Sequence, residues 1–200
     1  MIIEVEGIDG VGKTSQCQLL KSWFEETLGQ QAIIVKDLES TKLGRQIKDI
    51  LVTDAPRSRE VELFGFLCCK AHLFTEILEK EVEAGTHIIC DRGVGSFLSY
   101  FEVMGFERAF LETVLAVALP RTYCPQTILF DADVSVTLHR NLSKSMPSKF
   151  DSMGSGFFER QRKIYLELAS SKNWIVVSGE QSREAIHKSV IKIVEILLSS

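Results

Sequence analysis

The chain has 200 residues, of which 45% are hydrophobic and 25% are charged, and its formal net charge at pH 7 is −4. This size and composition are typical of one globular domain that spans residues 1–200. The acidic balance argues against non-specific binding to nucleic acid or to an anionic membrane, because both attract basic proteins. We see no signal peptide and no run of roughly 18 apolar residues that could span a membrane, so we expect a cytoplasmic protein.

In chain order, short apolar runs alternate with longer stretches of helical spacing. The apolar runs predict five buried strands, at residues 2–7, 32–36, 87–91, 127–131 and 174–178. The stretches between them predict helices at residues 14–28, 58–84, 96–119, 134–142, 156–170 and 183–198, the third of them broken near Met104 and Gly105. This alternation indicates a three-layer α/β/α fold, in which a five-stranded parallel sheet is flanked by helices on both faces.

The first predicted strand is followed by a glycine-rich sequence, Gly7-Ile-Asp-Gly-Val-Gly-Lys-Thr14, which matches the phosphate-loop pattern G-x-x-x-x-G-K-[ST]. Glycines let successive backbone N–H groups converge on phosphate oxygens, and the N-terminus of the next helix adds partial positive charge. Lys13 is suited to the β- and γ-phosphates of ATP, and Thr14 is suited to Mg²⁺. We therefore predict a P-loop NTPase fold whose nucleotide-binding residues are Gly7, Ile8, Asp9, Gly10, Val11, Gly12, Lys13, Thr14 and Ser15.

Other polar residues follow the ends of the later strands, which is where ligands bind in parallel sheets. Asp37 follows the second strand, and Asp91 and Arg92 lie at the end of the third. We interpret Asp131 and Asp133, after the fourth strand, as helix-capping residues rather than metal ligands. The sequence lacks the base-reading Asn-Lys-x-Asp pattern of GTPases, so the set favours a small-molecule phosphotransferase with two anionic substrates.

Residues 142–155 differ in character from the helices around them. They are rich in Ser, Gly and Lys, contain a proline and lack apolar periodicity, which predicts a short lid between two helices. Lys144 and Lys149 of this segment are either cations that close over a phosphate group or solvated loop residues.

Five segments share their order and spacing with those of one known kinase family. They are EGIDGVGKTSQ (6–16), STKLG (40–44), ELFGFLCCKAH (62–72), ICDRGVGSFLSY (89–100) and KFDSMGSGFFERQRKIYLELA (149–169). On these segments the chain resembles the thymidylate kinase family of the P-loop nucleoside monophosphate kinases, nearly end to end. The resemblance implies transfer of the γ-phosphate of ATP to dTMP to give dTDP, with Mg²⁺. It also implies a homodimer built through the long helices, with Phe64, Leu67 and residues 96–119 as candidate contacts.

The resemblance also implies roles for individual residues. The implied catalytic residues are Lys13, Asp91, Arg92, Lys144 and Lys149, the last two standing where the family's lid carries arginines. Thr14 and Asp91 are the implied Mg²⁺ ligands. The implied contacts of the acceptor nucleotide are Asp9, Asp37, Phe66, Lys70, Arg92 and Tyr100. Among these, Phe66 is expected to stack on the base, and Lys70 replaces a base-reading arginine.

The acceptor side departs from the family pattern at Lys70, Gly93, Phe97 and Phe101. Gly93 replaces an aromatic residue and is expected to free volume, while the two phenylalanines remove polarity. Two alternatives therefore stay open beside dTMP phosphorylation. One is a kinase for another pyrimidine nucleotide, including a modified one, and the other is a non-catalytic nucleotide-binding protein on the same scaffold.

Overall fold

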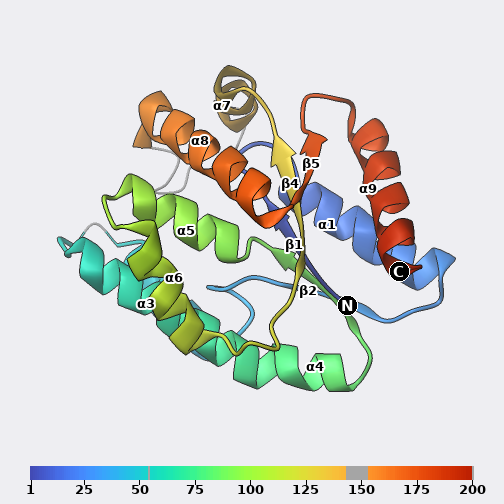
Figure 1. The fold of residues 1–200 in the computed structure, drawn as a ribbon, viewed down its shortest axis with the longest axis horizontal. Helices are drawn as coiled ribbons and strands as arrows, with labels where there is room; N and C mark the ends of the chain where they lie inside the picture. Colours follow the sequence, from blue (N-terminus) through green and yellow to red (C-terminus); the bar gives the residue numbers. More distant parts are fainter. Residues whose placement is uncertain (54, 143–152, 200) are drawn as a thin grey trace.

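The centre of the molecule is a parallel sheet of five strands in the order β2-β3-β1-β4-β5. We analysed it in a computed structural model that describes residues 1–53, 55–142 and 153–199. The strands are β1 (Ile2–Glu6), β2 (Ala32–Val35), β3 (His87–Asp91), β4 (Gln126–Asp131) and β5 (Ile175–Ser178). The predicted α/β fold, with five parallel strands between two helical layers, is confirmed (Figure 1).

The helices cover both faces of this sheet. One face carries α1 (Lys13–Ser22), which continues as a π-helical segment at Trp23–Thr27, and α9 (Arg183–Leu198). The other face carries α3 (Arg59–Leu73), α4 (Glu79–Glu83), α5 (Val94–Val103), α6 (Arg108–Ala118) and α8 (Ser155–Lys172). Helix α2 (Lys42–Leu51) packs on α3, and α7 (Val134–Leu142) packs on α8.

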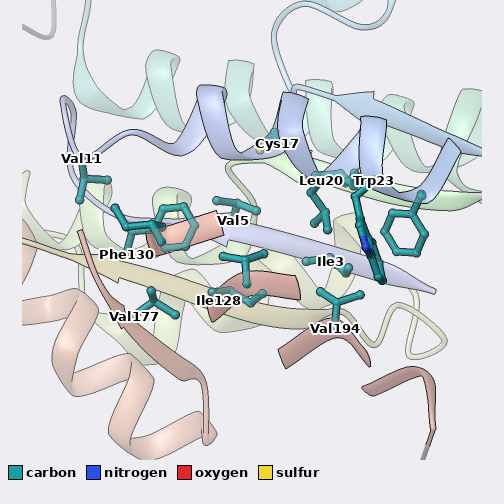
Figure 2. Packing of buried hydrophobic residues seen from close by; sticks show 14 of the residues in the cluster. Ile3, Val5, Val11, Cys17, Leu20, Trp23, Ile128, Phe130, Val177 and Val194 are labelled. Carbon is teal, nitrogen blue, oxygen red and sulfur yellow. The ribbon is translucent and has the colours of Figure 1, made fainter. Parts of the chain in front are cut away.

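The main hydrophobic core lies between the sheet and the α1–α9 layer. Ile3 and Val5 of the central strand point into it and meet Leu20 of α1 and Val194 of α9, all of which are buried (Figure 2). Because side chains alternate along a strand, the residue between these two must face the opposite helical layer. On that side β1 places Glu4, with only 1% of its surface exposed. The sequence suggested a plain apolar strand, so this buried carboxylate is a finding of the structure.

The predicted helices form, and one of the predicted stretches is divided further. Residues 58–84 fold as α3, then a π-helical segment at Phe74–Leu78, then α4. The predicted break in the third helical stretch is present, since α5 ends at Val103 and Gly105 has a left-handed φ of 90°. Most of the predicted lid at 142–155, with Lys144 and Lys149, lies outside the described residues. That the chain forms one domain stays a prediction.

Two acidic residues lie at the end of β4 and have different contacts, Asp131 as the last residue of the strand and Asp133 just after it. Asp133 caps α7, because its Oδ1 accepts a hydrogen bond from Ser135 N at 2.9 Å. Asp131 instead accepts two hydrogen bonds from the Arg162 guanidinium of α8, at 2.7 and 2.9 Å. The capping prediction is therefore right for Asp133 and wrong for Asp131, because a bidentate arginine pair uses both of its oxygens.

Candidate active site

The loop between β1 and α1 has the backbone of a phosphate-binding loop. Gly7, Gly10 and Gly12 all have left-handed φ values, of 138°, 88° and 102°. A side chain is also excluded at Gly7 by space, because a Cβ there would lie 2.4 Å from the Phe130 carbonyl oxygen of β4. Helix α1 begins directly after this loop, so its N-terminal N–H groups and partial positive charge are directed at the same place.

Lys13 is held inside the loop. Its Nζ donates hydrogen bonds to the carbonyl oxygens of Gly7 and Ile8, both at 2.8 Å, and the residue is 5% exposed. Burial, and next the positive charge of Arg92, lower the pKa of Lys13 to about 8. A bound phosphate would oppose both effects, because a nearby negative charge favours the ammonium form. Lys13 is thus a buried cation ready to pair with an anion.

Thr14 and Asp91 come from different elements and meet beside Lys13. The Thr14 hydroxyl donates to Asp91 Oδ2 at 2.7 Å, and Lys36 Nζ lies 3.2 Å from the same oxygen. A hydroxyl and a carboxylate fit Mg²⁺, which is held in nucleotide sites by one or two such protein oxygens together with phosphates and waters. No group of three His, Cys, Asp or Glu residues suited to a metal occurs within residues 1–53, 55–142 and 153–199.

Arg92 has an unusual backbone and a side chain that reaches the phosphate loop. Its φ is 81°, a left-handed value that is uncommon for residues other than glycine. Its guanidinium forms an ion pair with Asp9 and donates to Ser96 Oγ at 3.1 Å and to the Gly7 carbonyl oxygen at 3.4 Å. The predicted residues Asp9 and Arg92 are therefore in direct contact.

One cavity of about 540 Å³ joins the phosphate loop to a group of aromatic side chains. The aromatic residues that line it are Phe66, Phe97, Tyr100, Phe101, Phe157 and Phe158. Phe66 lies edge-on to Phe101, with 5.7 Å between ring centroids, and 6.1 Å from Tyr100. The lining thus combines the charged residues of the phosphate loop with flat apolar surfaces, so the cavity suits an anionic molecule with an aromatic ring.

Most of the residues predicted for the site line this single cavity. They are Asp9, Gly10, Gly12, Lys13, Thr14, Ser15, Asp37, Phe66, Asp91, Arg92 and Tyr100. Gly7, Ile8 and Val11 belong to the same loop but not to the lining; Ile8 and Val11 are buried in the core instead. Lys144 and Lys149 are not among the described residues.

Lys70 occupies a different place from the one expected of a base-reading residue. It is 3% exposed and does not line the cavity. Its Nζ donates to Asp37 Oδ2 at 2.7 Å and to the Gly93 carbonyl oxygen at 3.0 Å. The ammonium therefore stands behind Asp37 and fixes it, because a buried cation needs hydrogen-bonded partners.

The expectation that Gly93 frees volume is wrong. A Cβ at this position would lie 2.0 Å from Glu4 Cδ, so the space is filled by the glutamate of β1. Sequence reasoning could not see this, because the two residues are far apart in the chain and meet only in the sheet.

Sequence reasoning also missed three cations that line the cavity, namely Lys36, Lys48 and Arg140. Lys36 stands at the end of β2, immediately before Asp37, so the strand-end rule that selected its neighbour was enough to find it. Arg140 of α7 lines the cavity and donates to the Gly179 carbonyl oxygen at 2.8 Å. Its only signal was its position just before the predicted lid.

The buried Glu4 carboxylate leads to a prediction about stability. Burial, and next the charge of Glu6, raise the pKa of Glu4 to about 7, above the ordinary value of 4.5. A raised carboxyl pKa stabilises the fold fully below about pH 4.5, and this contribution is lost as the pH rises through 7. Between pH 4.5 and 7 the unfolding free energy of the native chain should therefore fall by about 3 kcal/mol from this group, and Glu4→Gln should abolish this fall.

Urea unfolding of both proteins at several pH values measures this difference. Glu83→Gln, at the exposed end of α4, controls for the loss of one negative charge at the surface. Parallel pH curves for Glu4→Gln and the native chain would contradict the prediction.

The phosphate loop at the first strand of a parallel sheet, with a cavity leading from it, defines a protein of the P-loop NTPase class. The thymidylate kinase family model matches residues 5–190. The chain belongs to the thymidylate kinase family.

Individual comparisons agree along the whole chain. The chain is 32% identical to a probable thymidylate kinase of Pyrococcus abyssi, with 96% of this chain and 95% of that protein covered. It is 30% identical to a thymidylate kinase of Fervidobacterium nodosum, with 96% and 98% covered. A crystal structure of thymidylate kinase from Ehrlichia chaffeensis has the same fold, with a TM-score of 0.79, 22% identity and 98% of both chains covered.

Within the part of the chain that the structure describes, no helix is both long enough and apolar enough to cross a bilayer.

Proposed function

We propose that this chain transfers the γ-phosphoryl group of ATP to dTMP and so produces dTDP. The observation that carries the proposal is the continuous cavity that runs from Lys13 and Thr14 to Phe66 and Tyr100. A phosphoryl transfer between two nucleotides needs such a cavity, because donor and acceptor must lie end to end for in-line displacement. Family membership supports the same pair of substrates.

The donor half is proposed to bind ATP at the phosphate loop. Lys13 is placed to exchange its two carbonyl partners for β- and γ-phosphate oxygens. The Thr14 hydroxyl and the Asp91 carboxylate are the oxygens that would hold Mg²⁺, directly or through water. When bound, this ion offsets negative charge on the phosphate groups.

The acceptor half is proposed to bind dTMP by its ring and its phosphate. Phe66 and the aromatic residues around it offer a flat surface to the pyrimidine. Arg92 lines the same cavity and its guanidinium contacts Asp9 and Gly7 of the phosphate loop, so it can contact the acceptor phosphate and the transferring group. No general base is required, because the attacking phosphate oxygen is already negatively charged.

A panel of nucleoside monophosphates tests this assignment. ADP release is measured by a coupled assay with ATP, Mg²⁺ and each monophosphate in turn, and dTMP is expected to give the highest kcat/KM. Faster turnover with another pyrimidine nucleotide would mean that this nucleotide, and not dTMP, is the preferred acceptor. ATP binding in calorimetry without transfer to any acceptor would show a non-catalytic nucleotide-binding protein.

We also propose that two copies of the chain associate through α3 and α6. These helices expose large apolar side chains, namely Val61, Phe64, Phe110 and Val117. Contiguous exposed apolar surface is characteristic of protein interfaces. Leu67, also named as a candidate contact, is instead buried in the core against α5 and α6. Light scattering should give the mass of a dimer, and Val117→Glu should shift it toward the monomer.

A further inference from the structure

Glu4 is a buried carboxylate with no part in the steps above. Its Oε1 accepts hydrogen bonds from Val94 N at 2.9 Å and from the Tyr123 hydroxyl at 2.6 Å. Its Oε2 accepts one from the Thr127 hydroxyl at 3.3 Å. A buried carboxylate in a central strand destabilises the fold unless its oxygens accept hydrogen bonds. The groups that donate to Glu4 therefore indicate its structural role.

The partner nearest to the cavity is the first turn of α5. The N–H groups at a helix start have no acceptor within the helix. Here two residues of β1 provide acceptors for them. Glu6 accepts from Gly93 N at 2.9 Å, and Glu4 accepts from Val94 N. Lys70 donates to the Gly93 carbonyl oxygen at 3.0 Å. The backbone at the start of α5 is therefore fixed by charged side chains on several sides.

Glu4 and Gly93 are also interlocked by shape. A Cβ on residue 93 would lie within 2.0–2.5 Å of three atoms of the Glu4 side chain, Cδ, Oε1 and Cγ. The backbone of Gly93 has a φ of −146° and a ψ of −138°, which lie outside the regions preferred by residues with a side chain, so the conformation and the contact with Glu4 both favour glycine. The absence of a Cβ leaves the space that the glutamate occupies to reach Val94 N.

Arg92 lies directly before the residues that Glu4 and Glu6 hold. It lines the cavity and has a left-handed φ of 81°. Its own N–H donates to the Val5 carbonyl oxygen at 3.1 Å. A non-glycine residue stays in this conformation only when the surrounding structure holds it there.

We propose that Glu4 is a positioning residue, which with Gly93 fixes the backbone of residues 92–94 and so directs the Arg92 guanidinium into the cavity. The kinetic part of this inference rests on the proposed kinase function. Arg92 contacts the transferring group, so a misplaced guanidinium should lower kcat while ATP binding at the phosphate loop stays intact.

Two substitutions of similar volume separate positioning from packing. Glu4→Gln keeps an acceptor for Val94 N, whereas Glu4→Leu fills the space without one. We expect Glu4→Leu to lower kcat about tenfold or more with KM for ATP within about twofold of native, and Glu4→Gln to stay within about threefold. Thr127→Val, which removes another hydrogen bond of the same carboxylate, is the control and should keep native kcat within about twofold.

Hydrogen exchange of the peptide covering residues 91–97 gives a second readout that does not need turnover. Exchange should be faster in Glu4→Leu by about tenfold or more, and close to native in Glu4→Gln and Thr127→Val. Equal exchange and equal kcat in Glu4→Leu and the native chain would overturn the proposal. If the native chain shows no transfer to any acceptor, the kinase function fails, and the exchange data still decide whether Glu4 holds the backbone.

The interlock is tested separately by a double-mutant cycle, which also serves if Glu4→Leu does not fold. Gly93→Ala should lower kcat about tenfold or more in the native background, because its Cβ meets the glutamate. In a Glu4→Ala background, the same change should lower kcat at least about threefold less than in the native background, because only the backbone strain of alanine at ψ −138° remains. Equal effects of Gly93→Ala in the two backgrounds would mean that the residues act independently and would overturn the interlock.

Discussion

Lys13→Met is expected to lower kcat by about 10³-fold or more, with the fold retained. The reason is that the Lys13 ammonium is a buried donor next to the expected β- and γ-phosphate positions, where a preorganised charge has its largest effect on the transition state. Methionine keeps the length and apolar volume of the side chain but removes the charge. Steady-state kinetics with ATP and dTMP, together with circular dichroism, measure the two properties.

Lys21→Met is the matched control for this substitution. Lys21 is on the same helix, but it pairs with Glu25 at the protein surface, 2.9 Å away, rather than with the phosphate loop. We expect it to keep native kcat and to change the unfolding free energy by less than about 1 kcal/mol. Comparable loss of kcat in both variants would mean that the effect arises from α1 as a whole and not from the loop.

Arg92→Gly is expected to lower kcat by about 10²–10³-fold without a matching decrease in the unfolding free energy. The guanidinium is lost from the junction of the donor and acceptor halves, which accounts for the kinetic effect. At the same time, glycine adopts the left-handed φ of 81° without strain, which stabilises the folded state by up to about 1–2 kcal/mol and offsets the lost ion pair with Asp9.

Asn173→Gly provides the control for the backbone effect. Asn173 is the other described non-glycine residue with a left-handed φ, of 55°, and it ends α8 at an exposed position that does not line the cavity. This variant should keep native kcat and be as stable as the native chain or slightly more stable. A large loss of stability in Arg92→Gly would show instead that the Asp9 ion pair outweighs the backbone strain.

The local features of the fold were predictable because they depend on short-range patterns. Five apolar runs gave the five strands, and the glycine spacing from Gly7 to Thr14 located the phosphate loop at the end of the first strand. Asp91 followed from the same logic, since carboxyl ends of parallel strands share one edge. These predictions rest on periodicity and backbone geometry, which a single sequence contains.

What could not be predicted depends on contacts between distant segments. Glu4 and Gly93 meet only once β1 and α5 are packed, and Lys70 turns to Asp37 rather than to the cavity for the same reason. Arg140 of α7 lines the cavity, and no spacing pattern in the sequence predicted this position. Such long-range pairs decide side-chain direction, whereas composition and periodicity decide only which element a residue belongs to.

The alternation along β1 also has a consequence for how the chain finds its register. Ile3 and Val5 face Leu20 and Val194, while Glu4 on the opposite face meets hydrogen-bond donors. Sliding β1 by one residue against its neighbours would turn the apolar pair toward those donors and place carboxylates in the hydrocarbon layer. A one-residue slip would then bury polar carboxyl groups without partners, which is strongly unfavourable. The carboxylates that hold the start of α5 therefore also disfavour one-residue slips of the central strand.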